Sequence, residues 1–420
     1  MTDTMITQMP KYELYKDSGV EWLGNIPHSW GILRLKHLCA IKTGDKDTVH
    51  RTDDGMYPFY IRSPKVQRIN TYSYDGEAIL TAGDGDIGKI FHYVNGKFDF
   101  HQRVYKFSDF TQVKAKYLYY YLHHNLAEEV VKLSAKTTVD SLRLPYLQNF
   151  YVAIPSDIEQ LSIVNFLDDK AGRIDKAIAI KQNQIVLLKE RKQIIIQQAV
   201  TQGLNPDAPM KDSGVDWIGE IPEHWGIVRF KNLFTQSRLP VRKGDGVVTS
   251  YRDGQVTLRS NRRAGGYTEA ILEGGYQGIR KGQLVLNSMD AFEGAIGVSD
   301  SDGKCTPEYV ICDPINNVNV SQYYFAYLLR EMALAKYIQV ICNAVRQRAV
   351  RIRYSNLAPL FMVVPPIKEQ EDIVSFIEKE SAKLDAGIKH LNEQISKLKE
   401  YKTTLINSAV TGKIKVTELA

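Results

Sequence analysis

A segment of 23 residues near the N-terminus recurs almost unchanged in the middle of the chain. Residues 16–38 (KDSGVEWLGNIPHSWGILRLKHL) and 211–233 (KDSGVDWIGEIPEHWGIVRFKNL) are identical at 15 of 23 positions, at a constant offset of 195. A length of 420 residues fits three domains of ~150 residues or two larger repeats equally well. The duplicated segment favours two related halves.

Two short motifs in the later part of the first half also recur in the second half, at an offset of 210. Glu159-Gln160 recurs as Glu369-Gln370, and Ala199-Val200-Thr201 recurs as Ala409-Val410-Thr411. Each half therefore consists of the duplicated segment, a divergent globe and a long helical segment. The two globes are residues 16–156 and 211–366.

The long helical segments carry apolar residues on alternating steps of three and four, which is the pattern of a coiled-coil seam. In the first segment these residues are Val164, Leu167, Ala171, Ile174, Ile178, Ile185, Leu188, Ile195 and Ala199. In the second segment they are Val374, Ile377, Leu384, Ile388, Leu391, Ile395, Leu398, Leu405 and Ala409. A helix of about 40–45 residues is ~60–68 Å long.

Two matching apolar stripes in one chain predict that the helices pack against each other. Repeats that meet through equivalent seams are most simply related by a two-fold axis, which makes the helices antiparallel. A parallel pairing is the alternative. The fold class expected from these patterns is α+β: two mixed α/β globes joined by two long antiparallel coiled-coil helices, in a pseudo-two-fold tandem repeat.

Both globes are expected to be rich in β-strands. Strand patterns occur at 77–81, 98–107 and 283–287, and each globe also contains an aromatic helical segment, at 117–122 and 323–329. Buried core is the favoured interpretation of these tyrosines. The tryptophan-proline motif (Trp22, Pro27 and Trp30, with their counterparts 195 residues later) is also expected to be structural, with partner docking as the alternative.

Composition excludes several classes of protein. The four cysteines form no CxxC pair, and the nine histidines have no metal-ligand spacing with them, so no zinc site or disulfide framework is indicated. No apolar run approaches the roughly 18–20 residues of a membrane span, and the N-terminus has no apolar signal segment. A cytoplasmic location with a reducing environment is expected.

No catalytic motif stands out. Residues 83–89 (GDGDIGK) match the spacing of a phosphate-binding loop, but Ile90 stands where such a loop needs Ser or Thr. Asp84 and Asp86 would also bring negative charge towards a phosphate, so a tight turn that uses the glycines is favoured. The Pro365-Pro366 pair lacks the flanking residues of an adenine methyltransferase motif.

Clustered basic residues are the main indication of a polyanionic partner, since the net charge is only +6. Residues 346–353 hold four arginines and no acid, and closely spaced guanidiniums repel one another unless an anion neutralises them. Arginine also reads guanine edges bidentately. A solvated loop is the alternative. The candidate DNA-binding residues are Arg62, Lys65, Arg68, Gln102, Arg103, Lys136, Arg143, Arg259, Arg262, Arg263, Arg346, Gln347, Arg348, Arg351 and Arg353.

Taken together, these motifs resemble those of the DNA-specificity subunits of type I restriction-modification systems. The resemblance rests on the two duplicated segments, on Ile154-Pro155 and Val364-Pro365 before each Glu-Gln pair, on Ala-Val-Thr near each helix end, and on residues 290–297 (DAFEGAIG). It covers essentially the whole chain.

The resemblance implies a non-catalytic subunit in which each globe reads one half of a split target in double-stranded DNA. The domains would be a target-recognition domain at 1–156, a connecting helix at 157–204, a second recognition domain at 205–366, a second helix at 367–412 and a tail at 413–420. It also implies two methyltransferase subunits and restriction/translocase subunits as partners. S-adenosylmethionine, ATP and magnesium are expected on those partners, with no cofactor and no metal on this chain.

Two other classes of function stay open from the sequence. A coiled-coil scaffold with two globes that do not bind DNA predicts binding that is indifferent to DNA. A degenerate nucleotide hydrolase built on residues 83–89 predicts stabilisation by nucleotide.

Overall fold

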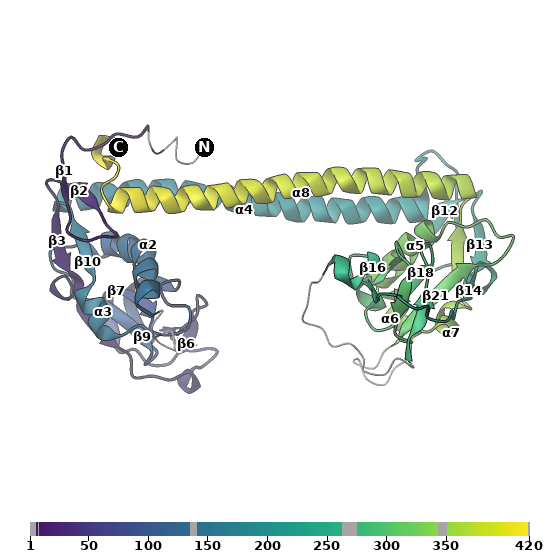
Figure 1. The fold of residues 1–420 in the computed structure, drawn as a ribbon, viewed down its shortest axis with the longest axis horizontal. Helices are drawn as coiled ribbons and strands as arrows, with labels where there is room; N and C mark the ends of the chain where they lie inside the picture. Colours follow the sequence, from purple (N-terminus) through teal and green to yellow (C-terminus); the bar gives the residue numbers. More distant parts are fainter. Residues whose placement is uncertain (1–5, 7, 135–140, 263–274, 343–350, 419–420) are drawn as a thin grey trace. The chain divides into compact units, whose positions relative to one another are not determined.

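The computed structural model describes residue 6 and residues 8–134, 141–262, 275–342 and 351–418. The chain forms two compact units, the first made of residues 1–183 and 391–420 and the second of residues 184–390. The two long helices of Figure 1 are α4 (Asp157–Gln202) and α8 (Ile367–Val410), and they correspond to the two predicted seams. Each unit contains one globe and part of both helices.

The duplicated segments form the same pair of small sheets in each unit, which we call the frame. In the first unit β1 (Tyr15–Asp17) pairs with β2 (Asn25–Pro27), and β3 (Gly31–Arg34) pairs with β10 (Tyr151–Ile154). In the second unit β11 (Met210–Asp212) pairs with β12 (Glu220–Pro222), and β13 (Gly226–Arg229) pairs with β22 (Phe361–Val364). All four pairings are antiparallel.

Residues that are identical in both copies of the duplicated segment form the turn between the two strands of the first small sheet. In each copy an aspartate carboxylate accepts a hydrogen bond of 2.9 Å from the backbone N–H of the glycine two residues on, Gly19 or Gly214. These glycines have φ of 68° and 62°, a region that disfavours other residues. Trp30 and Trp225 are buried. The structural interpretation of the motif is therefore confirmed.

The same motif packs against the end of a long helix. In the first unit the end of α8 is followed by Gly412, where an added Cβ would lie 2.3 Å from Pro27. In the second unit the end of α4 is followed by Gly203, where an added Cβ would lie 3.2 Å from Trp225. Both glycines have φ near the left-handed helical value, 74° and 76°, as is usual for the residue after a helix.

Buried tyrosines satisfy backbone carbonyls at these helix ends, which have no partner within the helix. The hydroxyl of Tyr117 donates to the Val410 carbonyl at 3.0 Å, and the hydroxyl of Tyr324 donates to the Val200 carbonyl at 2.9 Å. Both tyrosines are fully buried, which confirms the core interpretation for them. The valines belong to the repeated Ala-Val-Thr motif.

The repeated Glu-Gln pair fixes the start of each long helix. The Gln160 side chain accepts from the Lys114 N–H at 2.7 Å and donates to the Pro155 carbonyl at 3.1 Å. The Gln370 side chain makes the equivalent bonds with Ser321 and Pro365, at 2.9 and 2.8 Å. Both glutamines are completely buried, so a side chain that both donates and accepts is needed there.

The long helices run antiparallel within each unit. In the first unit the ammonium groups of Lys402 and Lys181 bond to Asp175 and Gln394, at 2.6 and 2.5 Å. In the second unit Lys192 bonds to Asp385 at 2.7 Å. The partner number falls along α8 as the residue number rises along α4. Lys181 and Lys192 occupy two positions between the apolar residues of the first seam, and both make cross-helix contacts.

The predicted seam residues are all buried or half-buried. Ile195 is only half-buried, whereas its neighbour Ile196 is buried in the core of the second unit. Ala199, the next predicted seam residue, is also buried, so a second side of the helix is covered near the end of α4 in addition to the seam. The reason is that this end packs against the globe, including Trp225 and Phe230, as well as against α8.

The first globe is built on a six-stranded sheet in the order β4-β9-β7-β8-β5-β6. Its strands are β4 (Ala40–Thr43), β5 (Tyr57–Tyr60), β6 (Gln67–Ile69), β7 (Tyr74–Ala82), β8 (Phe91–Phe100) and β9 (Val104–Ser108). Helices α2 (Ala115–Ser134) and α3 (Leu144–Asn149) and the short helices η1 (Leu35–His37) and η2 (Thr48–His50) complete it.

This sheet must curl strongly. Phe98 pairs with Tyr74 on one side of β7, and Val104 pairs with Ala82 on the other side. The chain from 98 to 104 can reach at most ~20 Å, whereas residues 74 to 82 of a straight strand would span ~26 Å. β7 therefore curves, and the facing Gly76 and Gly96, with φ of 146° and 122°, lie within the curved ribbon.

The second globe is built on a different sheet, with strand order β14-β21-β18-β19. These strands are β14 (Phe234–Gln236), β21 (Tyr309–Pro314), β18 (Leu284–Asn287) and β19 (Ile296–Val298). Two ribbons join it: β15 (Val248–Ser250) with β16 (Val256–Leu258), and β17 (Gln277–Ile279) with β20 (Gly303–Cys305). The helical elements are η3 (Phe230–Asn232), η4 (Arg259–Asn261), η6 (Ala291–Glu293), α5 (Gln322–Leu334), α6 (Tyr337–Ile341) and α7 (Tyr354–Leu357).

The tyrosine bonds to the helix ends yield a first prediction. Tyr324→Phe should raise amide exchange near the end of α4, and Tyr117→Phe near the end of α8, because each leaves a buried carbonyl without this donor. A loss of ~1–3 kcal/mol of local stability is expected for each. Hydrogen exchange by mass spectrometry measures it. Tyr323→Phe, on an exposed neighbour of Tyr324, is the control and should change nothing.

The buried Glu331 on α5 yields a prediction for pH. Burial raises the pKa of Glu331 from 4.5 to about 7, although hydrogen bonds from Gln193 and the charge of Arg330 lower it. The folded chain then binds more protons than the unfolded chain between these values. The contribution of Glu331 to stability is complete below pH 4.5 and is lost as pH rises through 7.

Glu331→Gln should flatten this dependence, and the wild-type chain should lose up to ~3 kcal/mol more than the variant between pH 5 and 8. Urea unfolding at four pH values measures the difference. Glu371→Gln removes one charge at an exposed position of α8 and should leave the slope as in the wild type. Equal slopes for Glu331→Gln and wild type would contradict the prediction.

Candidate nucleic-acid interface

Three loops of the first globe bring two predicted arginines to one carboxylate. Arg62 follows β5, Asp84 follows β7, and Arg103 lies between β8 and β9. The Asp84 carboxylate accepts from Arg62 at 2.6 Å through Oδ1 and from Arg103 at 2.8 Å through Oδ2. The Asp84 side chain is 17% exposed, whereas those of Arg62 and Arg103 are 40% and 61% exposed. We call these three residues the Arg-Asp-Arg cluster.

The electrostatics of the cluster keep Asp84 ionised. Partial burial acts to raise the pKa of Asp84, but the hydrogen bonds and charges of Arg62 and Arg103 outweigh it and lower that pKa. Backbone contacts also hold the aspartate in place, because the Leu142 N–H donates to the Gly83 carbonyl at 2.8 Å. The two guanidiniums are therefore held side by side by a fixed negative charge.

The Gly-rich loop that contains Asp84 is a tight turn, as predicted. Gly85 and Gly88 both have φ of 73°, and an added Cβ at Gly88 would lie 2.5 Å from Ala127. Lys89, which would approach a phosphate in a nucleotide-binding loop, instead pairs with Asp86 of the same loop at 3.1 Å. The geometry gives no support to the nucleotide-hydrolase alternative.

The other predicted residues of the first globe have different surroundings. Gln102 is exposed and donates from Nε2 to Asp47 at 2.7 Å, beside the Arg-Asp-Arg cluster in sequence. Lys65, in the same loop as Arg62, and Arg143, directly before α3, are exposed. They leave charged groups at the surface of this globe.

Arg68 is partly a structural residue. Its guanidinium donates to the backbone carbonyls of Gly55 and Met56, at 2.9 and 3.4 Å. These bonds hold the turn before β5 against β6. Arg68 is still exposed, and its assignment as a DNA-binding residue stays a prediction.

In the second globe two predicted arginines lie near one ribbon. Arg262 pairs with Asp253 at 2.8 Å, and its guanidinium lies 4.1 Å from the centre of the Tyr251 ring. Arg259 is half-buried and donates to the Thr249 hydroxyl at 3.2 Å. Arg262 is the more accessible of the two.

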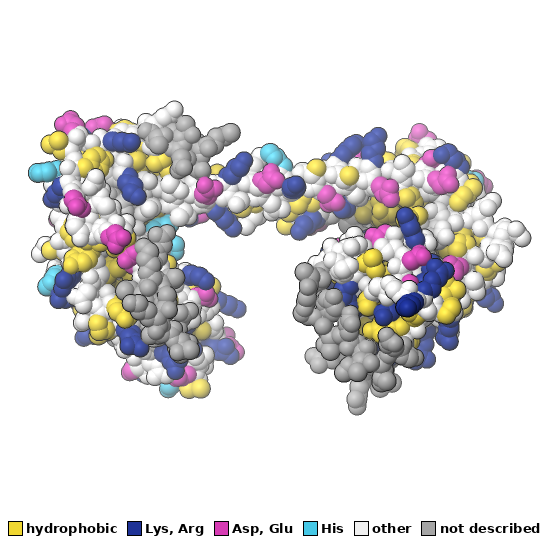
Figure 2. Space-filling view, viewed as in Figure 1, with side chains coloured by type: hydrophobic (Ala, Val, Ile, Leu, Met, Phe, Trp, Pro, Cys, Tyr) yellow, Lys and Arg dark blue, Asp and Glu magenta, His cyan; other side chains and the backbone are white. Residues whose placement is uncertain are grey.

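Three arginines of the second globe line one polar cavity of about 430 Å³. Arg351 and Arg353 lie between α6 and α7, and Arg238 follows β14. Arg351 pairs with Glu308 at 2.9 Å, and all three arginines are exposed. On the face drawn in Figure 2, Lys and Arg side chains (dark blue) gather on this globe beside apolar and acidic ones.

Five predicted residues lie outside the described part of the chain. They are Lys136, Arg263, Arg346, Gln347 and Arg348. Their assignment to a DNA-binding surface stays a prediction.

Two residues with a role in these clusters, Asp84 and Arg252, were not predicted from the sequence. Asp84 was considered only as an obstacle to nucleotide binding, and Arg252 was not singled out. Arg252 pairs with Asp290 at 2.9 Å and also with Glu293, which lies in the same short segment. The two acids of residues 290–297, Asp290 and Glu293, were a signal for the second, whereas no sequence spacing signals the meeting of loops at 62, 84 and 103.

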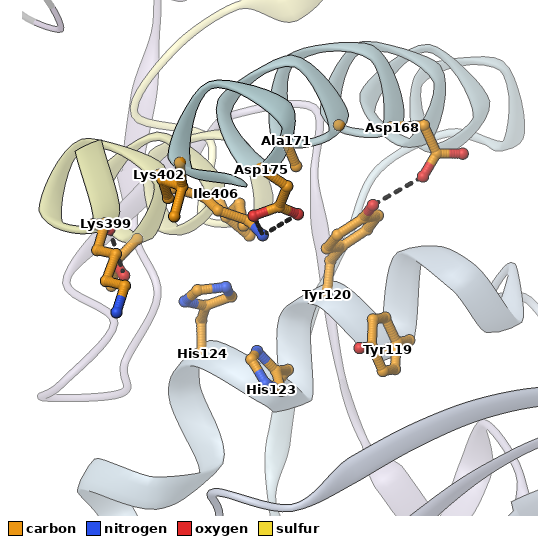
Figure 3. Close-up of a pocket in the computed structure, with 13 residues that line it drawn as sticks. Tyr119, Tyr120, His123, His124, Asp168, Ala171, Asp175, Lys399, Lys402 and Ile406 are labelled. Atoms are coloured by element: carbon orange, nitrogen blue, oxygen red, sulfur yellow. Dashed lines mark hydrogen bonds and ion pairs between the residues drawn. The ribbon is translucent and has the colours of Figure 1, made fainter. Parts of the chain in front are cut away.

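The first unit also contains a cavity of about 650 Å³ between α2 and the two long helices (Figure 3). Tyr120 donates to Asp168 at 2.7 Å, and Lys402 pairs with Asp175 at 2.6 Å. Burial lowers the pKa of His123 and brings that of His124 to about 3, so both imidazoles are neutral at pH 7. Asp168 also pairs with Lys116 at 2.6 Å, and Lys399 is a further cation on the cavity wall.

Metal and membrane features are absent from the described residues. Across 8–134, 141–262, 275–342 and 351–418, no group of three His, Cys, Asp or Glu side chains could hold a metal ion. No helix in these ranges has the length and apolarity to cross a bilayer.

Known proteins similar to this chain share one description. Residues 27–190 match the family model of the type I restriction modification DNA specificity domain. The specificity subunit of the type I restriction enzyme EcoDI from Escherichia coli is 23% identical over 411 residues, covering 93% of this chain and 90% of that protein. The EcoBI specificity subunit from the same species is 22% identical, covering 95% and 89%.

A solved structure with low sequence identity to this chain has a similar fold. A chain from a study of complex assembly and conformational transition of the type I R-M system has a TM-score of 0.66 at 13% identity. The match covers 92% of this chain and 98% of that one. The family model over residues 27–190, the two relatives and this fold together make the chain similar to type I restriction-modification DNA specificity subunits over most of its length.

Proposed function

We propose that this chain is the sequence-specific DNA-binding subunit of a type I restriction-modification complex, in which each globe reads one half of a bipartite target. The observation that carries the proposal is the contrast between the two units. The frame repeats residue by residue, whereas the sheets and arginine clusters of the globes differ. Two different half-sites need two different reading surfaces on one common frame.

The proposed mechanism of recognition divides the basic residues into two roles. Exposed lysines and arginines such as Lys65 and Arg143 bind phosphates and give affinity that falls with salt. Arginines held by neighbouring groups, such as Arg103 and Arg262, present oriented donors to base edges in the major groove. Orientation matters for the second role because a base edge requires a fixed pair of donors.

We propose that the antiparallel helices set the gap between the two half-sites and dock two methyltransferase subunits. An apolar surface supports docking. Within the second unit Val186, Leu187 and Ile194 of α4 are each at least half exposed. The positions of α8 that correspond to Leu187 and Ile194 are Lys397 and Thr404. S-adenosylmethionine, ATP and magnesium would be bound by methyltransferase and restriction/translocase partners, which supply the chemistry.

The function is tested by mapping methylated adenines in host DNA with and without this chain. A bipartite methylated sequence that disappears when the chain is deleted supports the proposal. Co-purification of methyltransferase subunits with the tagged chain is the second measurement. A scaffold with globes that do not bind DNA would leave the methylation pattern unchanged.

The arginine-lined cavity of the second globe yields a prediction for the second half-site. The double variant Arg351→Ala, Arg353→Ala should weaken DNA binding and relax only that half-site, because guanidinium contacts to phosphates or bases are lost. The slope of log affinity against log salt should fall by about 1–2. Binding titrations at several salt concentrations measure it.

Arg353→Lys separates the two roles of the side chain. A lysine keeps phosphate affinity but cannot form the bidentate fork, so it should retain affinity and lose base preference. If the double variant keeps the affinity and the preference of the wild type, these arginines do not face DNA.

The proposed spacing role yields a prediction for paired insertions. A heptad inserted after Asn183 in α4 and another after Asn392 in α8 keep the helix pairing, because Lys181 and Gln394 face each other nearby. Each heptad adds ~10.5 Å of helix, so the preferred gap should lengthen by up to about three base pairs. Methylome mapping reads the gap and both half-sites together.

A single insertion near the end of α4, after Val200, would not test the spacing as the paired insertions do. The Val200 carbonyl accepts the buried Tyr324 bond, so an insertion there would break the anchor of α4 in the second unit. If the paired variant still methylates the target with the original gap and both half-sites, the helices do not set the spacing.

A further inference from the structure

We propose that Asp84 is a positioning residue for recognition of the first half-site: its carboxylate holds Arg62 and Arg103 as one reading unit without itself reading a base. The inference rests on the proposed function and deepens it. It concerns a residue that the sequence associates only with a turn.

The geometry of the carboxylate is the first reason. Each oxygen of Asp84 accepts from a different arginine, Oδ1 from Arg62 and Oδ2 from Arg103. Each arginine bonds through Nη1, so Nη2 of both guanidiniums remains outside these two bonds. Since a guanidinium has five N–H donors in a rigid plane, fixing one nitrogen orients the rest.

The pattern of exposure is the second reason. The Asp84 side chain is the least exposed member of the cluster, and the two arginines project further into solvent. A duplex at this surface would therefore meet the guanidiniums before the carboxylate. The aspartate also lowers repulsion between the two like charges, which would otherwise drive the side chains apart.

The backbone around the cluster is the third reason. Asp84 is fixed by a β-bridge to Ser141 and by the hydrogen bond from Leu142 to Gly83. The Tyr105 hydroxyl donates to the Leu142 carbonyl at 3.0 Å, which ties this segment to β9. The carboxylate is thus attached to the sheet and can orient side chains from two other loops.

This role separates specificity from affinity. Phosphate binding depends on positive charge near the backbone, whereas base reading depends on orientation. Removing the negative charge of Asp84 should favour binding to any duplex while it frees both arginines. A purely structural aspartate would instead lower specific and non-specific binding together.

The test uses the full chain in complex with its methyltransferase subunits. Binding of Asp84→Asn is measured on the duplex that wild-type methylome mapping identifies, and on duplexes with the first or the second half-site scrambled. We expect discrimination at the first half-site to fall about tenfold, which is ~1.4 kcal/mol. Binding to the duplex with the first half-site scrambled should be equal to that of the wild type or up to about threefold tighter, whereas binding to the duplex with only the second half-site scrambled should weaken.

Asp86→Asn is the matched control. It removes the same charge from the same loop, and Asp86 is 64% exposed and pairs only with the neighbouring Lys89 among the ion pairs of the described residues. Any general effect of charge should appear in both variants. Loss of first-half-site discrimination should appear only in Asp84→Asn, and second-half-site discrimination should be that of the wild type in both.

A double-mutant cycle tests whether Asp84 acts through the arginines. In a chain that carries Arg62→Lys and Arg103→Lys, the further change Asp84→Asn should not reduce discrimination again. Two results would overturn the inference: unchanged discrimination in Asp84→Asn, or equal losses on all duplexes. If the wild-type complex itself shows no bipartite preference, the proposed function fails, and that result is distinct from either.

Discussion

The structure depends on a small set of hydrogen bonds that fasten the ends of the long helices to the globes. A helix end exposes carbonyl groups that have no partner in the helix, and burial of such groups is costly unless donors reach them. Tyr117 and Tyr324 supply such donors to α8 and α4, and Gln160 and Gln370 fasten the helix starts. The glutamines belong to the repeated Glu-Gln pairs, and the carbonyls that the tyrosines reach belong to the valines of the repeated Ala-Val-Thr motif.

These hydrogen bonds explain why particular residues recur in both halves of the chain, whereas the strands of the two globes do not. A buried glutamine that must both donate and accept tolerates few replacements, and a glycine at φ near 75° beside Trp225 or Pro27 tolerates none without strain. The globes are free of these constraints once their frame strands are paired. The six-stranded sheet of the first globe and the four-stranded sheet of the second can therefore carry different loops.

The two surfaces proposed to read DNA use the same chemistry in different arrangements. In the first globe one carboxylate holds two arginines, and in the second globe one arginine, Arg252, is held by Asp290 and Glu293. Arg262 is held between Asp253 and the ring of Tyr251. In each case a long cationic side chain is fixed by acidic or aromatic side chains next to it. Fixed cations differ from mobile ones in what they can discriminate, since only a fixed donor pair distinguishes base edges.

The sequence by itself determined the duplication, the two helical seams, the buried role of the tryptophan motif and the absence of a recognisable catalytic motif, because each depends on local periodicity or on residues repeated at a constant offset. It also located arginine-rich segments. It did not determine that Arg68 supports a turn, that Ile196 is buried beside the seam, or that Asp84 joins Arg62 and Arg103. Only the tertiary structure decided these points, since each depends on contacts between segments whose separation along the chain carries no periodic signal.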